Sequence, residues 1–154
     1  MSLPQNRPSF TASDAVTIDD LVLNLGEAEP YLPLLIVWNW DHDYVHPKFN
    51  FSGLDSGKQK SFIAQSNKIK KYTWQQSRNM AQSPVGNHTI PLSAIKPDIP
   101  PRLKDILEKQ AVRSVIRFKY EGKHLPVVGI TDTRGTFYVI WISRKRDDVY
   151  KDKK

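Results

Sequence analysis

The chain has 154 residues, with 11 prolines, no cysteine and a formal net charge of +7. The lack of cysteine excludes disulfides, cysteine nucleophiles and thiolate metal sites, and no apolar run reaches the roughly 20 residues that cross a bilayer. No basic region followed by an apolar stretch opens the sequence, so we expect a cytoplasmic protein without a membrane partner.

The charge is divided unevenly along the chain. Residues 1–55 hold 2 basic and 8 acidic side chains, whereas residues 56–154 hold 21 and 8. This asymmetry predicts a polyanion partner for the basic part, although solubilising charge would also explain it. We expect residues 1–30 to form an arm before a single domain at 31–154. Either this arm, anchored by Phe10, Leu21 and Leu23, or a separate partner protein is expected to cover the basic sheet.

The first two thirds of the chain predict strands followed by helices. Thr73 and Gln76 have the spacing of a capping box, which divides a long helical stretch in two. Prolines keep residues 89–101 mostly extended, and Pro101 opens a short helix to Glu108. The other expected elements are a capped helix at Thr17–Leu23, strands at Leu34–Trp40 and Lys48–Phe51, and helices at Lys58–Tyr72 and from Thr73 to Met80.

The last third predicts three strands, at Val112–Tyr120, Leu125–Ile130 and Thr136–Ile142. Short polar turns separate them, and consecutive strands joined by short turns form an antiparallel meander. The expected fold class is therefore α+β, with an antiparallel β-meander covered on one face by the helices of residues 58–80. Trp141 is expected in its core.

A basic segment, residues 144–150, follows the last apolar strand, so its first residues are expected at a sheet edge. The arginine side chain is a planar fork that fits phosphate oxygens, and a tyrosine such as Tyr150 can stack on a base. A ribonuclease without a metal needs cations to stabilise the scissile phosphate and groups that move protons. A solvated basic end is the alternative interpretation.

Arg117 and Lys119 alternate with apolar residues, so both point to one face of their strand. If this face lies beside Arg144, the sheet presents a cationic groove; an ordinary exposed strand face is the alternative. The further candidates for nucleic-acid binding are Arg113, Lys123, Lys145 and Arg146.

A third group, Asp41, His42, Asp43 and His46, contains residue types that bind divalent metals. It supports a weaker interpretation as a metal-dependent nuclease. Its spacing matches no metal motif, and a polar loop after a buried strand explains it better. We therefore expect no metal and no cofactor.

The element order and the closing residues resemble the RelE/ParE superfamily of bacterial toxins. Arg144-x-Arg146-x-x-Val149-Tyr150 is similar to the end of RelE-type ribosome-dependent ribonucleases, where an arginine and a tyrosine serve catalysis. Arg117-Phe118-Lys119 is similar to the strand that carries two basic catalytic residues. His124 stands where the family usually has an arginine that contacts the scissile phosphate. The resemblance covers residues 48–150 in element order and 112–150 in residues.

This resemblance implies a metal-independent endoribonuclease of a toxin–antitoxin system. RNA, including ribosome-bound mRNA, is the implied substrate, and an antitoxin protein is the implied partner. The catalytic candidates are Arg117, Lys119, His124, Arg144 and Tyr150. The stretch Trp74–Tyr150 is also similar to uncharacterised proteins of phage-like and mobile elements, which share a Gly-x-x-x-Ile-Pro loop, here residues 86–91. A non-catalytic nucleic-acid- or protein-binding adaptor from a mobile element is therefore the alternative.

Overall fold

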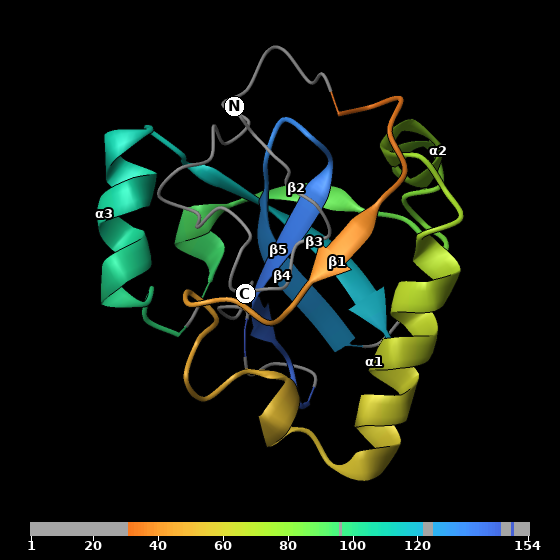
Figure 1. The fold of residues 1–154 in the computed structure, drawn as a ribbon, viewed down its shortest axis with the longest axis horizontal. Helices are drawn as coiled ribbons and strands as arrows, with labels where there is room; N and C mark the ends of the chain where they lie inside the picture. Colours follow the sequence, from red (N-terminus) through yellow and green to blue (C-terminus); the bar gives the residue numbers. More distant parts are fainter. Residues whose placement is uncertain (1–30, 96, 122–124, 146–148, 150–154) are drawn as a thin grey trace, which may run out of the picture.

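The computed structural model describes residues 31–95, 97–121, 125–145 and 149. This part is an α+β fold with one mixed five-stranded sheet, in the order β1-β5-β4-β3-β2 (Figure 1). The strands are β1 (Val37–Asn39), β2 (His88–Pro91), β3 (Ser114–Tyr120), β4 (Leu125–Thr131) and β5 (Thr136–Ile142). The helices are α1 (Ser56–Ile69), α2 (Trp74–Asn79) and α3 (Pro101–Lys109), with 3-10 turns η2 (Phe51–Gly53) and η3 (Leu92–Ala94). None of the described helices is long and apolar enough to cross a membrane.

The expected meander is present, but the sheet is not purely antiparallel. Strands β3, β4 and β5 pair antiparallel as neighbours. Strand β1, in contrast, pairs parallel with β5, with Val37 opposite Thr136. Three α-helices and three strands separate β1 from β5 in the sequence, and such a long connection allows parallel pairing. The prediction of an antiparallel sheet is therefore corrected to a mixed one.

The strand expected at Lys48–Phe51 is wrong. The Asn50 Oδ1 accepts a hydrogen bond from the Gly53 N–H at 3.0 Å, which caps the 3-10 turn η2. The Asn50 Nδ2 donates back to the carbonyls of His46 and Pro47. These local side-chain bonds compete with extended structure and curl the segment. It still contacts β5, because the Ile142 N–H donates to the Phe49 carbonyl at 2.8 Å.

The break between the two helices at Thr73 is confirmed. The Thr73 hydroxyl accepts from the Gln76 N–H at 3.1 Å, and the Gln76 Oε1 accepts from the Thr73 N–H at 2.9 Å. Upstream, the Asp55 carboxylate caps α1 by accepting from the Lys58 N–H at 2.8 Å. Pro101 opens α3, as the sequence predicts. The helix expected at residues 17–23 lies outside the described residues.

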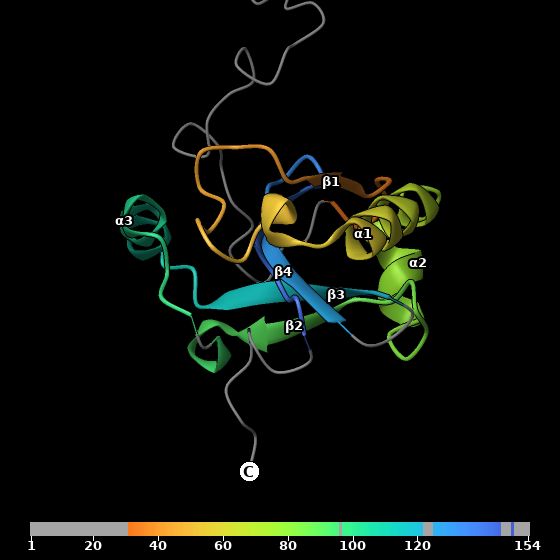
Figure 2. The ribbon, with the colours of Figure 1, turned by 90° about the horizontal axis from the view of Figure 1, so that it is seen from below.

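Apolar clusters fill both faces of the sheet, whereas the sequence placed helices on one face only. The helices α1 and α2 cover the first face, where Phe62 and Trp74 pack with Phe118. Helix α3 covers the second face with its buried stripe of Leu103, Ile106 and Leu107. Figure 2 shows α3 on one side of the strands and α1 with α2 on the other. The fully buried Trp141 belongs to the cluster beneath α3.

Candidate nucleic-acid interface

Arg117 and Lys119 lie on the same face of β3, as expected. The burial along this strand alternates, with Ile116, Phe118 and Tyr120 buried in the α1–α2 cluster. Arg117 and Lys119 are half-buried and project from the opposite face, the one that α3 partly covers. The strand period of two therefore separates the apolar and the basic side chains of β3.

His88 joins these two residues from the neighbouring edge strand. It stands directly opposite Arg117 in the β2–β3 register. Its Nε2 lies 3.0 Å from the Ala81 carbonyl oxygen, within hydrogen-bonding distance. The Lys119 Nζ donates to the same oxygen at 3.4 Å. His88 and Lys119 thus contact one carbonyl oxygen, and Arg117 stands beside them, opposite His88. We call His88, Arg117 and Lys119 the basic cluster.

The environment of the basic cluster favours a neutral histidine. Partial burial lowers the pKa of His88, and the positive charges of Arg117 and Lys119 lower it further. Burial also lowers the pKa of the Arg117 guanidinium. Because a carbonyl oxygen only accepts hydrogen bonds, the neutral His88 ring carries its hydrogen on Nε2. The lone pair is then on Nδ1, which has no hydrogen-bond partner among the described residues and can take up a proton.

The basic cluster borders buried apolar residues of the meander. Arg117 stands opposite Val128 in β4, and Val128 stands opposite Trp141 in β5. Val128 and Trp141 are both fully buried. The basic cluster therefore lies on β2 and β3, at one side of the sheet, and does not extend across β4 and β5.

Arg144 has a contact outside this cluster. Its guanidinium lies over the ring of Phe49, 4.7 Å from the ring centroid. The Phe49 carbonyl accepts a hydrogen bond from Ile142 at the end of β5. The single groove expected to contain both Arg117 and Arg144 therefore stays a prediction.

The other predicted residues are separate from the basic cluster or not described. Arg113 is exposed just before β3, about 13 Å from Arg117 along an extended chain. Lys145 is exposed beyond the end of β5. The remaining candidates, Lys123, His124, Arg146 and Tyr150, lie outside the described residues.

Hydrogen bonds of its two histidine rings hold the Asp41–His46 loop. The His42 Nε2 donates to the Val139 carbonyl at 2.9 Å, and its Nδ1 accepts from the Tyr44 N–H at 3.2 Å. Burial lowers the pKa of His42 to about 4, so the ring is neutral. The His46 Nδ1 accepts from the N–H groups that follow it. Among the described residues, no three acidic or histidine side chains are grouped as metal ligands.

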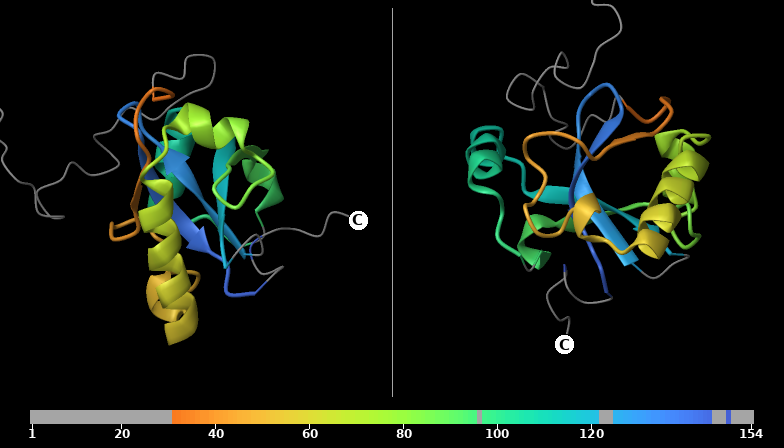
Figure 3. Two further views of the ribbon diagram at one scale, coloured as in Figure 1. Left: turned by 90° about the vertical axis from the view of Figure 1, so that its right-hand side faces the viewer. Right: turned by 60° about the horizontal axis from the view of Figure 1, so that its bottom comes forward.

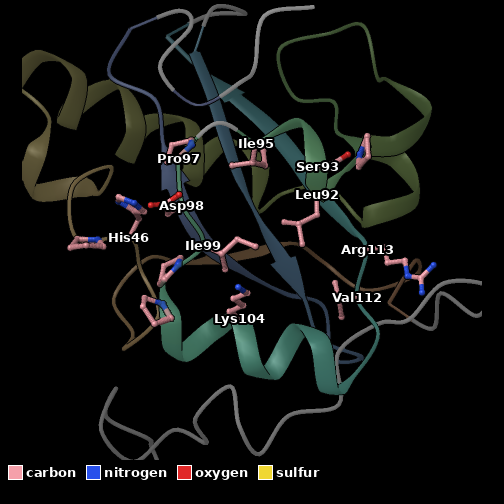
Figure 4. A pocket seen from close by; sticks show the side chains of 14 residues that line it. His46, Leu92, Ser93, Ile95, Pro97, Asp98, Ile99, Lys104, Val112 and Arg113 are labelled. Atoms are coloured by element: carbon pink, nitrogen blue, oxygen red, sulfur yellow. The ribbon is translucent and has the colours of Figure 1, made fainter.

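A large open groove of about 1200 Å³ lies beside the start of α3 (Figure 4). Its walls are mainly proline and aliphatic side chains from η3, from residues 97–101 and from α3. His46 and Arg113 stand at opposite ends, and Lys104 and Asp98 lie between them. Such a wall suits an extended or apolar segment better than a phosphate.

Comparison with known proteins adds no relative. No family model, curated protein or solved structure matches this chain.

Sequence reasoning did not include His88 among the candidate residues. The sequence predicts only that residues 89–101 are mostly extended, and the strand period of residues 88–91 is visible in their burial in the folded chain. The pairing of this short strand with β3 gives His88 its neighbours.

Proposed function

We propose that the protein binds RNA through the basic cluster and cleaves it without a metal, as a RelE-like toxin. The observation that carries this proposal is the position of His88 opposite Arg117, with His88 and Lys119 both at the Ala81 carbonyl oxygen. It combines two cations with a histidine that is neutral at pH 7. Those are the groups that cleavage of RNA by its own 2′-hydroxyl needs.

The proposed reaction uses each group in a stated way. His88 Nδ1 accepts the proton of a ribose 2′-hydroxyl, whose oxygen attacks the adjacent phosphorus. Arg117 and Lys119 stabilise the negative charge that grows on the phosphate oxygens. The bond to the 5′-oxygen breaks, and that oxygen takes up a proton from water. The products are a 2′,3′-cyclic phosphate and a 5′-hydroxyl, and DNA, which has no 2′-hydroxyl, is not cleaved.

Charge and resemblance support the same proposal. Residues 56–154 contain 21 basic side chains against 8 acidic ones, which favours a polyanion. The closing segment of the chain, residues 144–150, resembles that of RelE-type ribonucleases. Arg144, His124 and Tyr150 remain candidates for substrate contacts from that resemblance, with an antitoxin as partner.

The test uses purified full-length chain with a labelled single-stranded RNA and the DNA of the same sequence, in the presence of a chelator. We expect cleavage of the RNA alone, and His88→Ala should lower its rate by about 100-fold or more. Arg117→Ala and Lys119→Ala should each weaken RNA binding and lower the salt slope by about one. Lys60→Ala, which removes an exposed lysine on α1, is the matched control.

The outcomes separate the candidates. RNA binding without cleavage by the wild type would refute the enzyme and favour the adaptor. No binding, together with normal growth of cells after induced expression, would refute both RNA proposals. Arg144→Ala adds a further distinction, because Arg144 lies against Phe49 and should affect cleavage less than Arg117→Ala does.

A non-catalytic adaptor is the second candidate, and the groove beside α3 favours it. The proline and aliphatic walls of this groove can bind a peptide segment, and none of that surface is used in the cleavage reaction above.

A further inference from the structure

Three large apolar side chains are exposed at one edge of the sheet. Leu34, Leu35 and Val37, here called the β1 apolar row, are 40%, 56% and 54% exposed. They lead into β1, which is an edge strand. Among the other described residues only Ile63 is comparably exposed, at 41%. Neighbouring apolar side chains left in water mark an interaction surface.

Lysines at the end of α1 adjoin the β1 apolar row. The Ile36 N–H donates to the Tyr72 carbonyl at 3.1 Å, and the Trp74 N–H donates to the Leu34 carbonyl at 3.0 Å. Lys70 and Lys71, both exposed, come immediately before Tyr72. Figure 3 shows the β1 segment running beside α1. An apolar row with a cationic border fits an acidic amphipathic segment.

The chain itself contains such a segment. No lysine or arginine occurs between Arg7 and Lys48, and acidic residues are frequent in this interval. The four apolar residues Ile18, Leu21, Val22 and Leu25 have the spacing i, i+3, i+4, i+7, which forms one stripe on a helix. Asp19 and Asp20 fall between the first two of them.

The tether between this segment and the β1 apolar row is short. Tyr31 is buried, with its ring 5.0 Å from that of Trp74, and Trp74 is hydrogen-bonded to Leu34. Leu25 precedes Tyr31 by six residues, so it lies within about 20 Å of this anchor. A short linker gives a local concentration in the millimolar range.

The lengths of the two surfaces also agree. Ile18 to Leu25 measures about 10 Å along a helix, and Leu34 to Val37 measures about 10 Å along an extended chain. The proline-lined groove is the competing surface, but η3 follows β2, which is the opposite edge of the sheet.

We propose that residues 18–25 dock as an amphipathic helix on the β1 apolar row, with their acidic side toward Lys70 and Lys71. This intramolecular contact does not depend on the proposed function, because β1 and the basic cluster lie at opposite edges of the sheet.

The absence of cysteine makes a direct test possible, since any introduced pair is the only pair in the chain. In the full-length chain, Val22→Cys with Val37→Cys should form an intramolecular disulfide at least tenfold faster than Val22→Cys with Ser93→Cys. Ser93 is exposed and lines the groove at the other edge. Equal rates, a faster Ser93 pair or no disulfide in either chain would overturn the proposal. A covalent dimer as the main product of Val37→Cys alone would indicate a second copy of the chain as occupant and would also overturn it.

Protease access provides a second measurement, which needs no introduced cysteines. A protease specific for glutamate can cut after Glu27, in the tether. Val37→Asp should release the segment and raise this rate at least tenfold, whereas Ile63→Asp, at another exposed apolar position on α1, should not. An unchanged rate in Val37→Asp, or an equal rise in Ile63→Asp, would contradict the docking.

Discussion

Replacing Trp141 with alanine tests the core that supports the meander. The indole is fully buried in the cluster beneath α3, beside Val128 and Ile140. Truncating a buried tryptophan to alanine costs about 3–5 kcal/mol, because transfer free energy is lost and a cavity remains. In a domain of this size each kcal/mol lowers Tm by about 2–4 °C, so the expected fall is about 6–20 °C.

The Trp141→Phe variant separates packing from the polar part of the indole. The Trp141 Nε1 is buried and has no hydrogen-bond acceptor among the described residues. A buried donor without an acceptor costs about 1–3 kcal/mol, and phenylalanine removes it while keeping much of the apolar volume. We therefore expect Trp141→Phe to lose less than half of what Trp141→Ala loses, in urea unfolding with an unchanged m-value. Unchanged melting of Trp141→Ala, or equal losses in the two variants, would refute this account of the core.

Three further predictions concern local features. Gly129→Ala should lower the free energy of unfolding by about 1–3 kcal/mol or more, because a Cβ would meet the Tyr138 carbonyl oxygen at 2.0 Å. Gly57→Ala, the control in α1, should be neutral or stabilising, and comparable losses in the two variants would contradict this. Thr73→Ala should cost about 1 kcal/mol in urea unfolding and Thr73→Ser much less, and equal losses would argue against the cap. The pKa of His42 is about 4 in the folded chain against 6.5 unfolded, so its contribution is present above pH 6.5 and is lost as the pH falls toward 4. Between pH 7.5 and 4.5 the wild type should lose about 2–3 kcal/mol more than His42→Gln does, and parallel pH profiles would contradict the burial of this ring.

The sequence predicted those elements whose signals are local. The capping box at Thr73 and Pro101 at the start of α3 depend on residues a few positions apart, and both were placed correctly. The strand at Thr136–Ile142 was predicted with its observed bounds. The strand at Lys48–Phe51 failed for a local reason, because the Asn50 side chain bonds its own backbone neighbours.

The candidate site was harder to predict because it depends on pairing between distant segments. The shared face of Arg117 and Lys119 follows from the strand period, and this prediction is confirmed. The role of His88 depends on β2 pairing with β3 across about 20 intervening residues, a contact that no periodicity reveals. The contact between Arg144 and the ring of Phe49 also joins distant segments, and no local pattern predicts it.

The order of strands makes the β1 apolar row and the basic cluster energetically independent of each other. The β1 apolar row lies at one edge of the described sheet, and the basic cluster lies on β3 and on the other edge strand, β2, with β5 and β4 between them. Strands in a sheet are spaced by about 4.8 Å, so the two surfaces are separated by about 14 Å or more. Substitutions that share no contact at such a distance usually combine additively. Combining Val37→Asp with Arg117→Ala should therefore change RNA binding by no more than Arg117→Ala alone, unless residues 1–30, once released, reach the basic cluster through their acidic side chains. That exception has a distinct signature, because a released acidic arm would weaken RNA binding most at low salt, where exposed charges are screened least.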